Sequence, residues 1–302
     1  MRIQTYAFPY DVPVRFGSVG ELERALRAER YLPDRGLATA IYLALAMRRP
    51  LLLEGEAGVG KTEVAKTLAR LLDAELVRLQ CYEGIDAAQA LYEWDYSKQL
   101  LYARMLQEGE LDPERRLAVL HGPEFLLERP LLHALRLGPR AVLLIDELDR
   151  ADEEFEAFLL ELLSDFAVTV PEIGTIAAEE PPAVVVTSNR TRELHDALKR
   201  RCLYHWIDFP GVEREAEIVR LRAPEVSDAL ARAVAEAVAR LRALELAKRP
   251  GAAEAIDWAA ALALLGVSSL DADAARATLG WVVKNEDDLR LVDARLDELV
   301  GA

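Results

Sequence analysis

The residues best suited to chemistry lie in one short stretch, residues 55–62, which reads GEAGVGKT. Its glycines adopt backbone conformations that other residues resist, so successive N–H groups turn toward an anion at the N-terminus of the next helix. In this pattern the lysine reaches the β- and γ-phosphates and the threonine hydroxyl binds Mg²⁺. The stretch therefore predicts a site for ATP with Mg²⁺, in preference to a plain glycine turn. The residues expected to bind the nucleotide are Gly55, Glu56, Ala57, Gly58, Val59, Gly60, Lys61, Thr62 and Glu63, and Thr62 is also an expected metal ligand.

Two adjacent carboxylates, Asp146 and Glu147, follow the apolar run of residues 141–145. Such a run predicts a buried strand, and ligands of open α/β sheets bind beyond the carboxyl ends of the strands. We expect Asp146 to hold Mg²⁺ through water and Glu147 to polarise the water that attacks the γ-phosphate. Acidic residues after a strand also cap helices, so the pair takes its chemical meaning from the glycine-rich loop.

Polar residues also stand next to two further strand candidates. Asn189 follows the run VVVTS of residues 184–188, where its neutral amide would orient the attacking water or, alternatively, form a turn. The basic run KRR of residues 199–201 precedes the last strand candidate. From there Arg200 or Arg201 would reach the nucleotide of a neighbouring subunit. The alternative is a charged helix end, where cations suit the helix dipole.

Five short apolar segments predict strands, and helical patterns lie between them. Continuous apolar strands that alternate with helices are typical of a parallel sheet covered on both faces. We therefore expect an α/β fold with a five-stranded parallel sheet between helices. The expected strands span residues 51–53, 75–79, 141–145, 183–186 and 204–209, and the first expected helices span residues 19–30, 36–48 and 62–72.

The composition changes past Gly211, where alanine-rich helical patterns replace the strand signals. Residues 226–247, for example, keep apolar side chains at helical spacing. At 302 residues the chain is long enough for about two domains. We expect an α/β nucleotide-binding domain over residues 1–211 and a small all-helical lid domain over residues 212–302.

Charge and cysteine content narrow the partners and the compartment. Lys and Arg total 37 against 52 acidic residues, a net charge of −15, which repels nucleic acid and anionic membrane surfaces. The two cysteines, Cys81 and Cys202, lack metal-ligand spacing, and the four histidines form no ligand pair. Hydropathy predicts neither a membrane span nor a secretory leader. We therefore expect a cytoplasmic protein whose main partner is neither nucleic acid nor a membrane.

Together these motifs resemble the AAA+ ATPases, and within them the MoxR family, especially its CoxD-like group. The resemblance covers roughly residues 30–265 and includes LLIDELDRA, VVVTSNR and the basic segment LKRRC. It implies an AAA+ core with a helical lid, ATP hydrolysis, and a homo-oligomeric ring, usually of six subunits, with ATP between neighbours. It also implies that the ring remodels or matures a partner protein, often one with a von Willebrand factor A domain.

The resemblance also gives family roles to individual residues. Lys61 and Thr62 match the Walker A residues, and Asn189 matches the first sensor. Asp146 and Glu147 match the Walker B pair. The resemblance thus agrees with the roles that the residue types suggest.

Two family assignments stay open. Arg201 matches the arginine finger best, with Arg200 as the alternative. The second sensor arginine of the family falls where this chain has Glu254. Either Lys248 or Arg249 substitutes for that arginine, or the lid is coupled differently in this protein.

Residues 82–96 include three alternating aromatics, Tyr92, Trp94 and Tyr96. In an extended strand all three would share one face. In AAA+ rings this region can face the central pore. The alternative, which we favour, is a satellite cluster of the core.

From these observations we expect a chaperone-like ring ATPase that remodels or matures a partner protein, with assistance in metal or cofactor insertion as one form of that activity. One alternative is a nucleic-acid-dependent motor, which the net charge of −15 disfavours. The other is a P-loop kinase for a small molecule. The Asp146–Glu147 pair, Asn189 and the helical lid argue against such a kinase.

Overall fold

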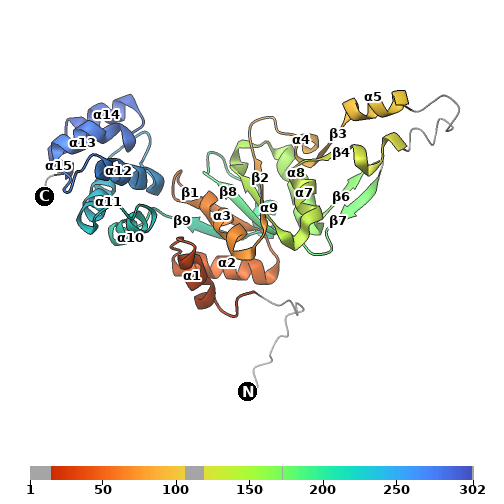
Figure 1. Cartoon of the computed structure of the whole chain (residues 1–302), viewed down its shortest axis with the longest axis horizontal. Helices are drawn as coiled ribbons and strands as arrows, with labels where there is room; N and C mark the ends of the chain where they lie inside the picture. Colours follow the sequence, from red (N-terminus) through yellow and green to blue (C-terminus); the bar gives the residue numbers. More distant parts are fainter. Residues whose placement is uncertain (1–14, 106–118, 172, 301–302) are drawn as a thin grey trace, which may run out of the picture. The chain divides into compact units, whose positions relative to one another are not determined.

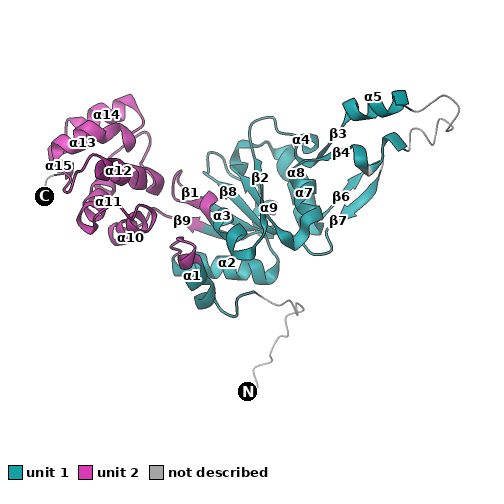
Figure 2. Ribbon diagram, in the orientation of Figure 1, with its two compact units in different colours: residues 1–25, 34–54, 64–205 teal, residues 26–33, 55–63, 206–302 magenta. Residues whose placement is uncertain are grey.

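The computed structural model describes residues 15–105, 119–171 and 173–300, so the irregular segment expected at the N-terminus lies mostly outside the described residues. The chain divides into two compact units, which Figure 2 colours separately. The domain boundary expected at residue 211 stays a prediction. Unit 1 takes residues 1–25, 34–54 and 64–205, and unit 2 takes residues 26–33, 55–63 and 206–302.

A five-stranded parallel sheet lies at the centre of the α/β fold (Figure 1). Every residue of β1 and β5 is buried, which is why these segments read as nearly unbroken apolar runs. The expected fold class is therefore confirmed. The strands are β1 (Leu51–Gly55), β2 (Glu75–Gln80), β5 (Ala141–Asp146), β8 (Ala183–Ser188) and β9 (Leu203–Ile207), in the spatial order β2-β5-β8-β1-β9.

The register of the sheet brings polar strand ends to one edge. Gln80 of β2 pairs with Asp146 of β5, and Glu54 of β1 pairs with Ser188 of β8. Because these strand pairs are parallel, the carboxyl ends of the strands meet at the same edge. Glu147 directly follows β5 and therefore lies at this edge of the sheet.

Helices flank the sheet, and side-chain caps determine where several of them begin. Asp34 accepts a hydrogen bond from the Leu37 N–H at 2.7 Å, and Asp152 accepts one from the Phe155 N–H at 2.8 Å. The three helices expected first along the chain are found within two residues of their expected ends. The helical elements here are α1 (Val19–Ala28), α2 (Arg35–Met47), α3 (Lys61–Leu72), α7 (Pro130–Leu137), α8 (Glu153–Asp165) and α9 (Asp196–Arg201), with the 3₁₀ turns η2 (Gly138–Arg140) and η3 (Leu148–Arg150).

Two β-ribbons and helix α5 lie on one side of unit 1 (Figure 1). The three aromatics of residues 92–96 would share one face only in a strand that reaches Tyr96, but β3 ends at Trp94, after a short helix that the Asp86 side chain caps. Trp94 then belongs to the buried core, as the satellite-cluster interpretation predicts, whereas Tyr96 begins a helix and is exposed. The elements are α4 (Ala87–Leu91), β3 (Tyr92–Trp94), α5 (Tyr96–Met105), η1 (Pro123–Phe125), β4 (Leu126–Glu128), β6 (Ala167–Val170) and β7 (Gly174–Ala177).

Unit 2 consists mainly of helices around a core of its own. Trp258 is fully buried there, and its indole N–H donates to the Thr278 hydroxyl at 2.7 Å. The helix expected over residues 226–247 is shorter: it begins after Ser227, whose side chain caps it, and it ends at Arg242. The elements are α10 (Val212–Arg222), α11 (Asp228–Arg242), α12 (Ala252–Leu264), α13 (Ala272–Thr278), η4 (Leu279–Trp281), α14 (Glu286–Asp293) and α15 (Leu296–Val300). Within the described ranges, no helix has both the length and the apolar character that crossing a membrane requires.

Candidate nucleotide site

The glycine-rich loop between β1 and α3 encloses the ammonium group of its own lysine. Lys61 is 7% exposed, and its Nζ donates to the carbonyl oxygens of Gly55 at 2.7 Å and of Glu56 at 2.8 Å. Helix α3 begins at Lys61, so its N-terminus opens onto the loop. A buried ammonium group and a helix N-terminus both favour an anion, so this loop has the chemistry of a phosphate site.

Two positions in the loop require glycine for different reasons. Gly58 has a φ of +78°, and a Cβ atom there would lie 2.9 Å from the Cα of Gly251. Gly60 has a φ of +95°, but a Cβ atom there would meet nothing within 4 Å. Left-handed backbone strain thus selects glycine at both positions, and close packing adds to it at Gly58 alone.

The N-terminus of α12 packs against the same loop within unit 2. The Ala252 N–H donates to the carbonyl oxygen of Gly58 at 3.0 Å. Glu254 Oε2 accepts a hydrogen bond from the Gly251 N–H at 3.0 Å, and a Cβ atom on Gly58 would lie 3.0 Å from the same oxygen. Glu254 therefore caps α12 at the position where the family resemblance would place an arginine, and the Ala252–Gly58 hydrogen bond joins this helix to the loop. Lys248 is exposed, and nothing in the structure gives it that arginine's place.

Asp146 lies at the end of β5, and both of its carboxylate oxygens are bound. Oδ1 accepts a hydrogen bond from Thr187 Oγ1 at 2.5 Å, and Oδ2 accepts from Arg78 Nε at 3.0 Å and Nη2 at 2.6 Å. The side chain is only 3% exposed, whereas that of Arg78 is 51% exposed. A buried carboxylate at this depth requires such partners, and Arg78 supplies the opposite charge.

Each of the two predicted metal ligands carries a donor that suits Mg²⁺ rather than a soft metal. Asp146 of unit 1 has a carboxylate and Thr62 of unit 2 a hydroxyl, and oxygen atoms are the ligands that Mg²⁺ prefers. Within the described residues, no group of three or more His, Cys, Asp or Glu side chains is placed to hold a metal ion.

Glu147 has an unusual backbone conformation and a partly exposed carboxylate. Its φ of 55° lies in the left-handed region, which residues other than glycine rarely adopt. Its N–H donates to Thr187 Oγ1 at 2.9 Å, and its Oε2 accepts from Gln80 Nε2 at 3.0 Å. Arg150 Nε lies 3.2 Å from the same oxygen. One hydroxyl, that of Thr187, thus contacts both predicted Walker B residues.

Asn189 is held by a buried carboxylate behind it. Asp149, which is 3% exposed, accepts from the Asn189 N–H at 3.1 Å and from the Thr191 N–H at 2.8 Å. The Thr191 hydroxyl donates to the same carboxylate at 2.7 Å. These bonds hold the backbone in place at the end of β8, where Asn189 follows the strand.

Arg200 and Arg201 end α9, and both are exposed. They line a surface cavity of about 500 Å³ together with Met47 of α2 and Leu163 of α8. In the described part of the chain neither arginine has an ion-pair partner, unlike Arg48, Arg78 and Arg150 of the same unit. The structure therefore leaves both guanidinium groups available at the surface and does not distinguish between them.

Comparison with known families decides what this arrangement is. Residues 50–202 match the family described as AAA domain (dynein-related subfamily), which is half of the chain. The chain belongs to this AAA family. It is accordingly an AAA+ ATPase, as the motifs predict.

Relatives of this AAA protein carry several names. It is 26% identical over 202 residues to Protein NorQ of Paracoccus denitrificans, a MoxR-family AAA+ ATPase, and covers 66% of that chain. It is 32% identical over 197 residues to Chaperone protein ClpB 2 of Parasynechococcus marenigrum, of which it spans 19%. Among solved structures, a RuvB mutant of Thermotoga maritima superposes with a TM-score of 0.50 at 20% identity, covering 93% of this chain and 79% of that one. This last likeness shows the fold alone.

Sequence reasoning missed four polar residues that support the AAA site: Arg78, Gln80, Asp149 and Thr187. A signal for two of them exists in β2, where Arg78 and Gln80 alternate on one face at the carboxyl end of the strand. Charged and amide groups facing the end of a neighbouring buried strand predict contact with a ligand or with another polar group. No comparable pattern marks Thr187, which reads as an ordinary β-branched strand residue.

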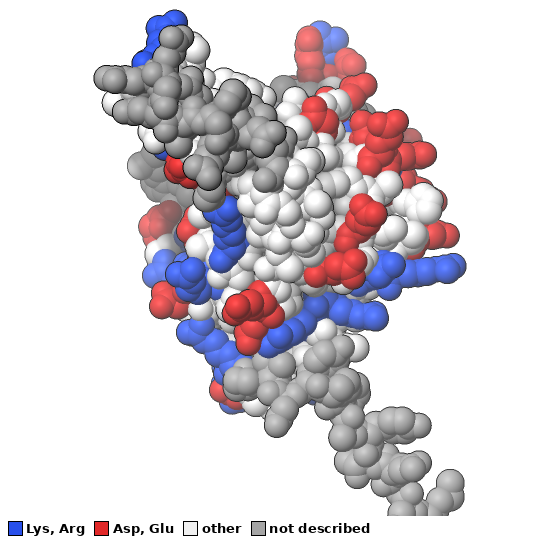
Figure 3. Space-filling model, turned by 90° about the vertical axis from the view of Figure 1, so that its right-hand side faces the viewer, with Lys and Arg blue, Asp and Glu red and all other residues white. Residues whose placement is uncertain are grey.

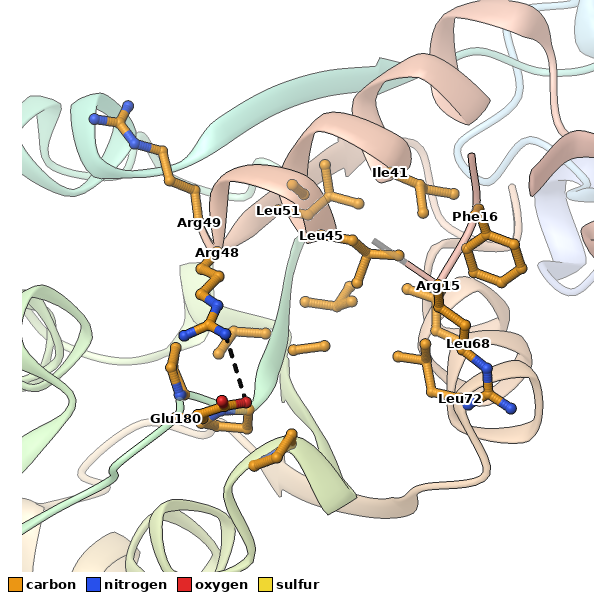
Figure 4. A pocket seen from close by; sticks show the side chains of 17 residues that line it. Arg15, Phe16, Ile41, Leu45, Arg48, Arg49, Leu51, Leu68, Leu72 and Glu180 are labelled. Atoms are coloured by element: carbon orange, nitrogen blue, oxygen red, sulfur yellow. Dashed lines mark ion pairs between the residues drawn. The ribbon is translucent and has the colours of Figure 1, made fainter. Parts of the chain in front are cut away.

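Unit 1 of the AAA protein also holds an apolar cavity of about 270 Å³, away from these motifs (Figure 4). Leu51 and Ala183, which begin β1 and β8, line this cavity together with Phe16. Arg48 Nη2 and Glu180 Oε2 form an ion pair of 3.5 Å beside it. Because the cavity lies at the amino ends of the strands, it is separate from the edge that carries the Walker B pair.

Proposed function

We propose that this chain is the ATP-hydrolysing subunit of a ring that remodels or matures a partner protein. The observation that carries the proposal is helix α5, which has no buried residue. Tyr96, Leu101 and Met105 on this helix are 68%, 63% and 77% exposed. Large apolar side chains exposed together mark a surface for protein contact, which a kinase for a small molecule does not need.

The two halves of the ATP chemistry have separate roles in this proposal. The N–H groups of residues 55–62 and the Lys61 ammonium would bind the phosphates, and Thr62 and Asp146 are the residues that would hold Mg²⁺. Bound Mg²⁺ would neutralise charge on the phosphates. Glu147 accepts a proton from the attacking water, and Asn189 orients that water.

The ring is supported by the two exposed arginines of α9. Arg201, or Arg200 beside it, would reach the nucleotide of a neighbouring subunit and stabilise the charge that develops there. Neither guanidinium group is bound to a carboxylate within the described part of its own chain. We propose a homo-oligomer of six subunits, as the MoxR resemblance implies.

The client is proposed to be a protein with a von Willebrand factor A domain, in the cytoplasm. The kinship with NorQ and with chaperone proteins named ClpB supports remodelling of a protein. The net charge of −15 favours a protein client over nucleic acid. Assistance with insertion of a metal or cofactor into the client is the finer form of this proposal.

The experiment is co-purification with a Glu147→Gln variant, which is expected to bind ATP·Mg²⁺ and to stay bound to its client. Candidate von Willebrand factor A proteins are then added to the wild-type enzyme at low salt, and the rate of ATP turnover is measured. The same rate is measured with single-stranded DNA, duplex DNA or RNA in place of the protein. Stimulation by the protein supports the proposal. Stimulation by nucleic acid alone contradicts it and favours a nucleic-acid motor.

A further inference from the structure

A groove of about 890 Å³ lies in unit 1 between the two β-ribbons. All three residues of β3 line one side, Ala167–Thr169 of β6 line the other, and α4 and α8 contribute residues such as Leu91 and Phe158. Figure 3 shows the side of the molecule that bears the ribbons in Figure 1, where uncharged side chains form a central area with acidic side chains beside it. The groove is distinct from the residues that carry the ATP chemistry.

Backbone groups that the ribbons do not use face outward from the two strands. Among the described residues, each ribbon has two strands, β3 with β4 and β6 with β7. In the β6–β7 ladder, the carbonyl oxygen of Phe166 accepts a hydrogen bond from the Ala178 N–H. Because ladder bonds fall on alternate residues of a strand, the N–H and C=O groups of Ala167 and Thr169 point away from β7. Beside β3, the carbonyl oxygen of Leu91 and the N–H of Asp95 form hydrogen bonds across to the segment that contains β4. By the same alternation, the backbone N–H and C=O groups of Trp94 point away from β4. The groove is therefore bordered by strand edges able to pair with an added strand.

The charged side chains that line the groove are all acidic. Glu93, Glu161 and Asp165 line it, and no Lys, Arg or His side chain among the residues that the structure describes does so. Glu93 pairs with Arg129, but Glu161 and Asp165 are exposed and have no ion-pair partner in the described part of the chain. Both lie on α8, where the spacing of four residues puts them on one face. This lining attracts a cation and repels nucleic acid.

Aromatic side chains give the groove a second kind of contact. Tyr92 and Trp94 meet edge to face with ring centroids 6.2 Å apart, and Phe158 of α8 also lines the groove. Alternate residues of an extended segment point to opposite sides, so one set would meet the aromatic rings and the other the carboxylates. An occupant with both basic and apolar side chains thus fits the lining.

We propose that this groove binds an extended segment of the client protein in which basic and apolar side chains alternate, and that the segment pairs as a strand with the edge of β6. The inference rests on the proposed function, because it assumes a protein client. At about 3.3 Å per residue, a strand as long as β3 or β6 places roughly four to six residues in contact. Main-chain bonds would supply affinity, and the α8 carboxylates would select positive charge.

The first test uses charge reversal on the full chain. The probe is a fluorescein-labelled decapeptide of alternating lysine and valine, read by anisotropy, with a counterpart that has glutamate in place of lysine. The Glu161→Lys/Asp165→Lys double variant should bind the lysine peptide at least tenfold more weakly and should gain binding of the glutamate peptide. Glu153→Lys/Glu154→Lys makes the same charge change in the first turn of α8, outside the groove, and should leave binding within twofold.

The second test removes one backbone donor at the edge of β6. Thr169→Pro deletes an outward N–H while leaving the β6–β7 ladder bonds in place, and should weaken the lysine peptide by about three- to tenfold. Thr175→Pro is the matched control, because it deletes the outward N–H on the opposite edge of the same ribbon and breaks the same Thr169–Thr175 hydroxyl contact of 3.0 Å. Equal loss in both variants would contradict strand pairing at β6.

The outcomes separate this inference from the proposed function. The groove assignment is wrong if the lysine peptide does not bind the wild-type chain. It is also wrong if charge reversal at Glu161 and Asp165 does not reverse the preference for the lysine peptide over the glutamate peptide. Stimulation of ATP turnover by a protein partner would then still support the proposed function. Conversely, if the peptide binds in the groove but no protein stimulates ATP turnover, the groove assignment stands and the proposed protein client is wrong. Self-association that competes with the peptide would assign the groove to a second copy of the chain instead.

Discussion

Replacing Arg242 with methionine should destabilise unit 2, because it leaves a buried carboxylate without its partner. Glu215 is fully buried, and Arg242 is 8% exposed. The guanidinium group donates to the Glu215 carboxylate at 2.7 and 2.6 Å, and its Nε donates to the Pro250 carbonyl at 2.7 Å. It also lies 4.3 Å from the centre of the Phe209 ring. The Pro250 contact links this pair to the turn that places Gly251 against the phosphate-binding loop.

The expected loss can be worked from these contacts. Breaking one side of a buried ion pair costs about 3–5 kcal/mol, which is a large part of a typical unfolding free energy of roughly 5–15 kcal/mol. Methionine keeps most of the apolar stem, so the loss comes from the charge and the hydrogen bonds. The Arg242→Met/Glu215→Leu double variant removes both charges and leaves only the Pro250 carbonyl unpaired, at about 1–3 kcal/mol. The double variant should therefore be more stable than the single one.

The titration of Glu215 predicts how the loss of stability in Arg242→Met changes with pH. Burial raises the pKa of the Glu215 carboxyl above its usual value, and Arg242 opposes that rise. A carboxyl with a raised pKa binds its proton more readily in the folded chain, so its contribution to stability falls as the pH rises through the folded pKa. Without Arg242 the pKa rises further. The loss caused by Arg242→Met should thus be larger at pH 8 than at pH 5.

Urea unfolding followed by circular dichroism and tryptophan fluorescence at both pH values measures these differences. The reasoning is refuted if Arg242→Met loses less than about 1 kcal/mol, or if the double variant is as unstable as the single variant. A loss that is greater at pH 5 would contradict the assignment of the buried carboxylate as its cause.

Three further perturbations test the ATP site. Arg78→Met should lower the unfolding free energy by about 1–3 kcal/mol without nucleotide, and by less with ATP·Mg²⁺, because the metal replaces the lost positive charge; equal losses in thermal melts would contradict this. Gly58→Ala should raise the Kd for ATP more than Gly60→Ala does in equilibrium titrations, because only the former also packs against the lid helix. Arg201→Ala should bind ATP but hydrolyse it about 10³-fold more slowly, and mixing it with Lys61→Ala should restore activity if the finger acts on a neighbour. A mixture with no activity would place the arginine within its own subunit.

The sequence predicts β1 and β5 well because these strands are buried along their whole length. Residues 51–53 and 141–145 read as apolar runs, and the loop that follows the first has glycines wherever the backbone needs a positive φ. Helix ends were predicted closely where a capping side chain is present, as at Asp34. Local sequence is thus sufficient wherever one element determines its own conformation.

Contacts between distant residues could not be predicted in this way. The Arg78–Asp146 pair joins residues from two strands and depends on the order of the strands in the sheet. Alternation made Tyr96 look like part of a strand, but Asp86 starts a helix and leaves only three residues for β3. Glu254 was an unexplained departure until the structure showed that it caps α12 beside the loop. The first case depends on a tertiary contact, whereas the other two depend on helix caps that the sequence reasoning did not recognise.

The most direct test of the account is a comparison of ATP binding and phosphate release between the wild-type chain and Glu147→Gln. The carboxylate is expected to act on water and not on the nucleotide, so the variant should bind ATP·Mg²⁺ with a Kd close to that of the wild type. Its rate of phosphate release should fall by about 10²- to 10⁴-fold, while Glu154→Gln, an exposed change on α8, should leave the rate unchanged. Phosphate release by Glu147→Gln at the wild-type rate would contradict the assignment of the catalytic centre.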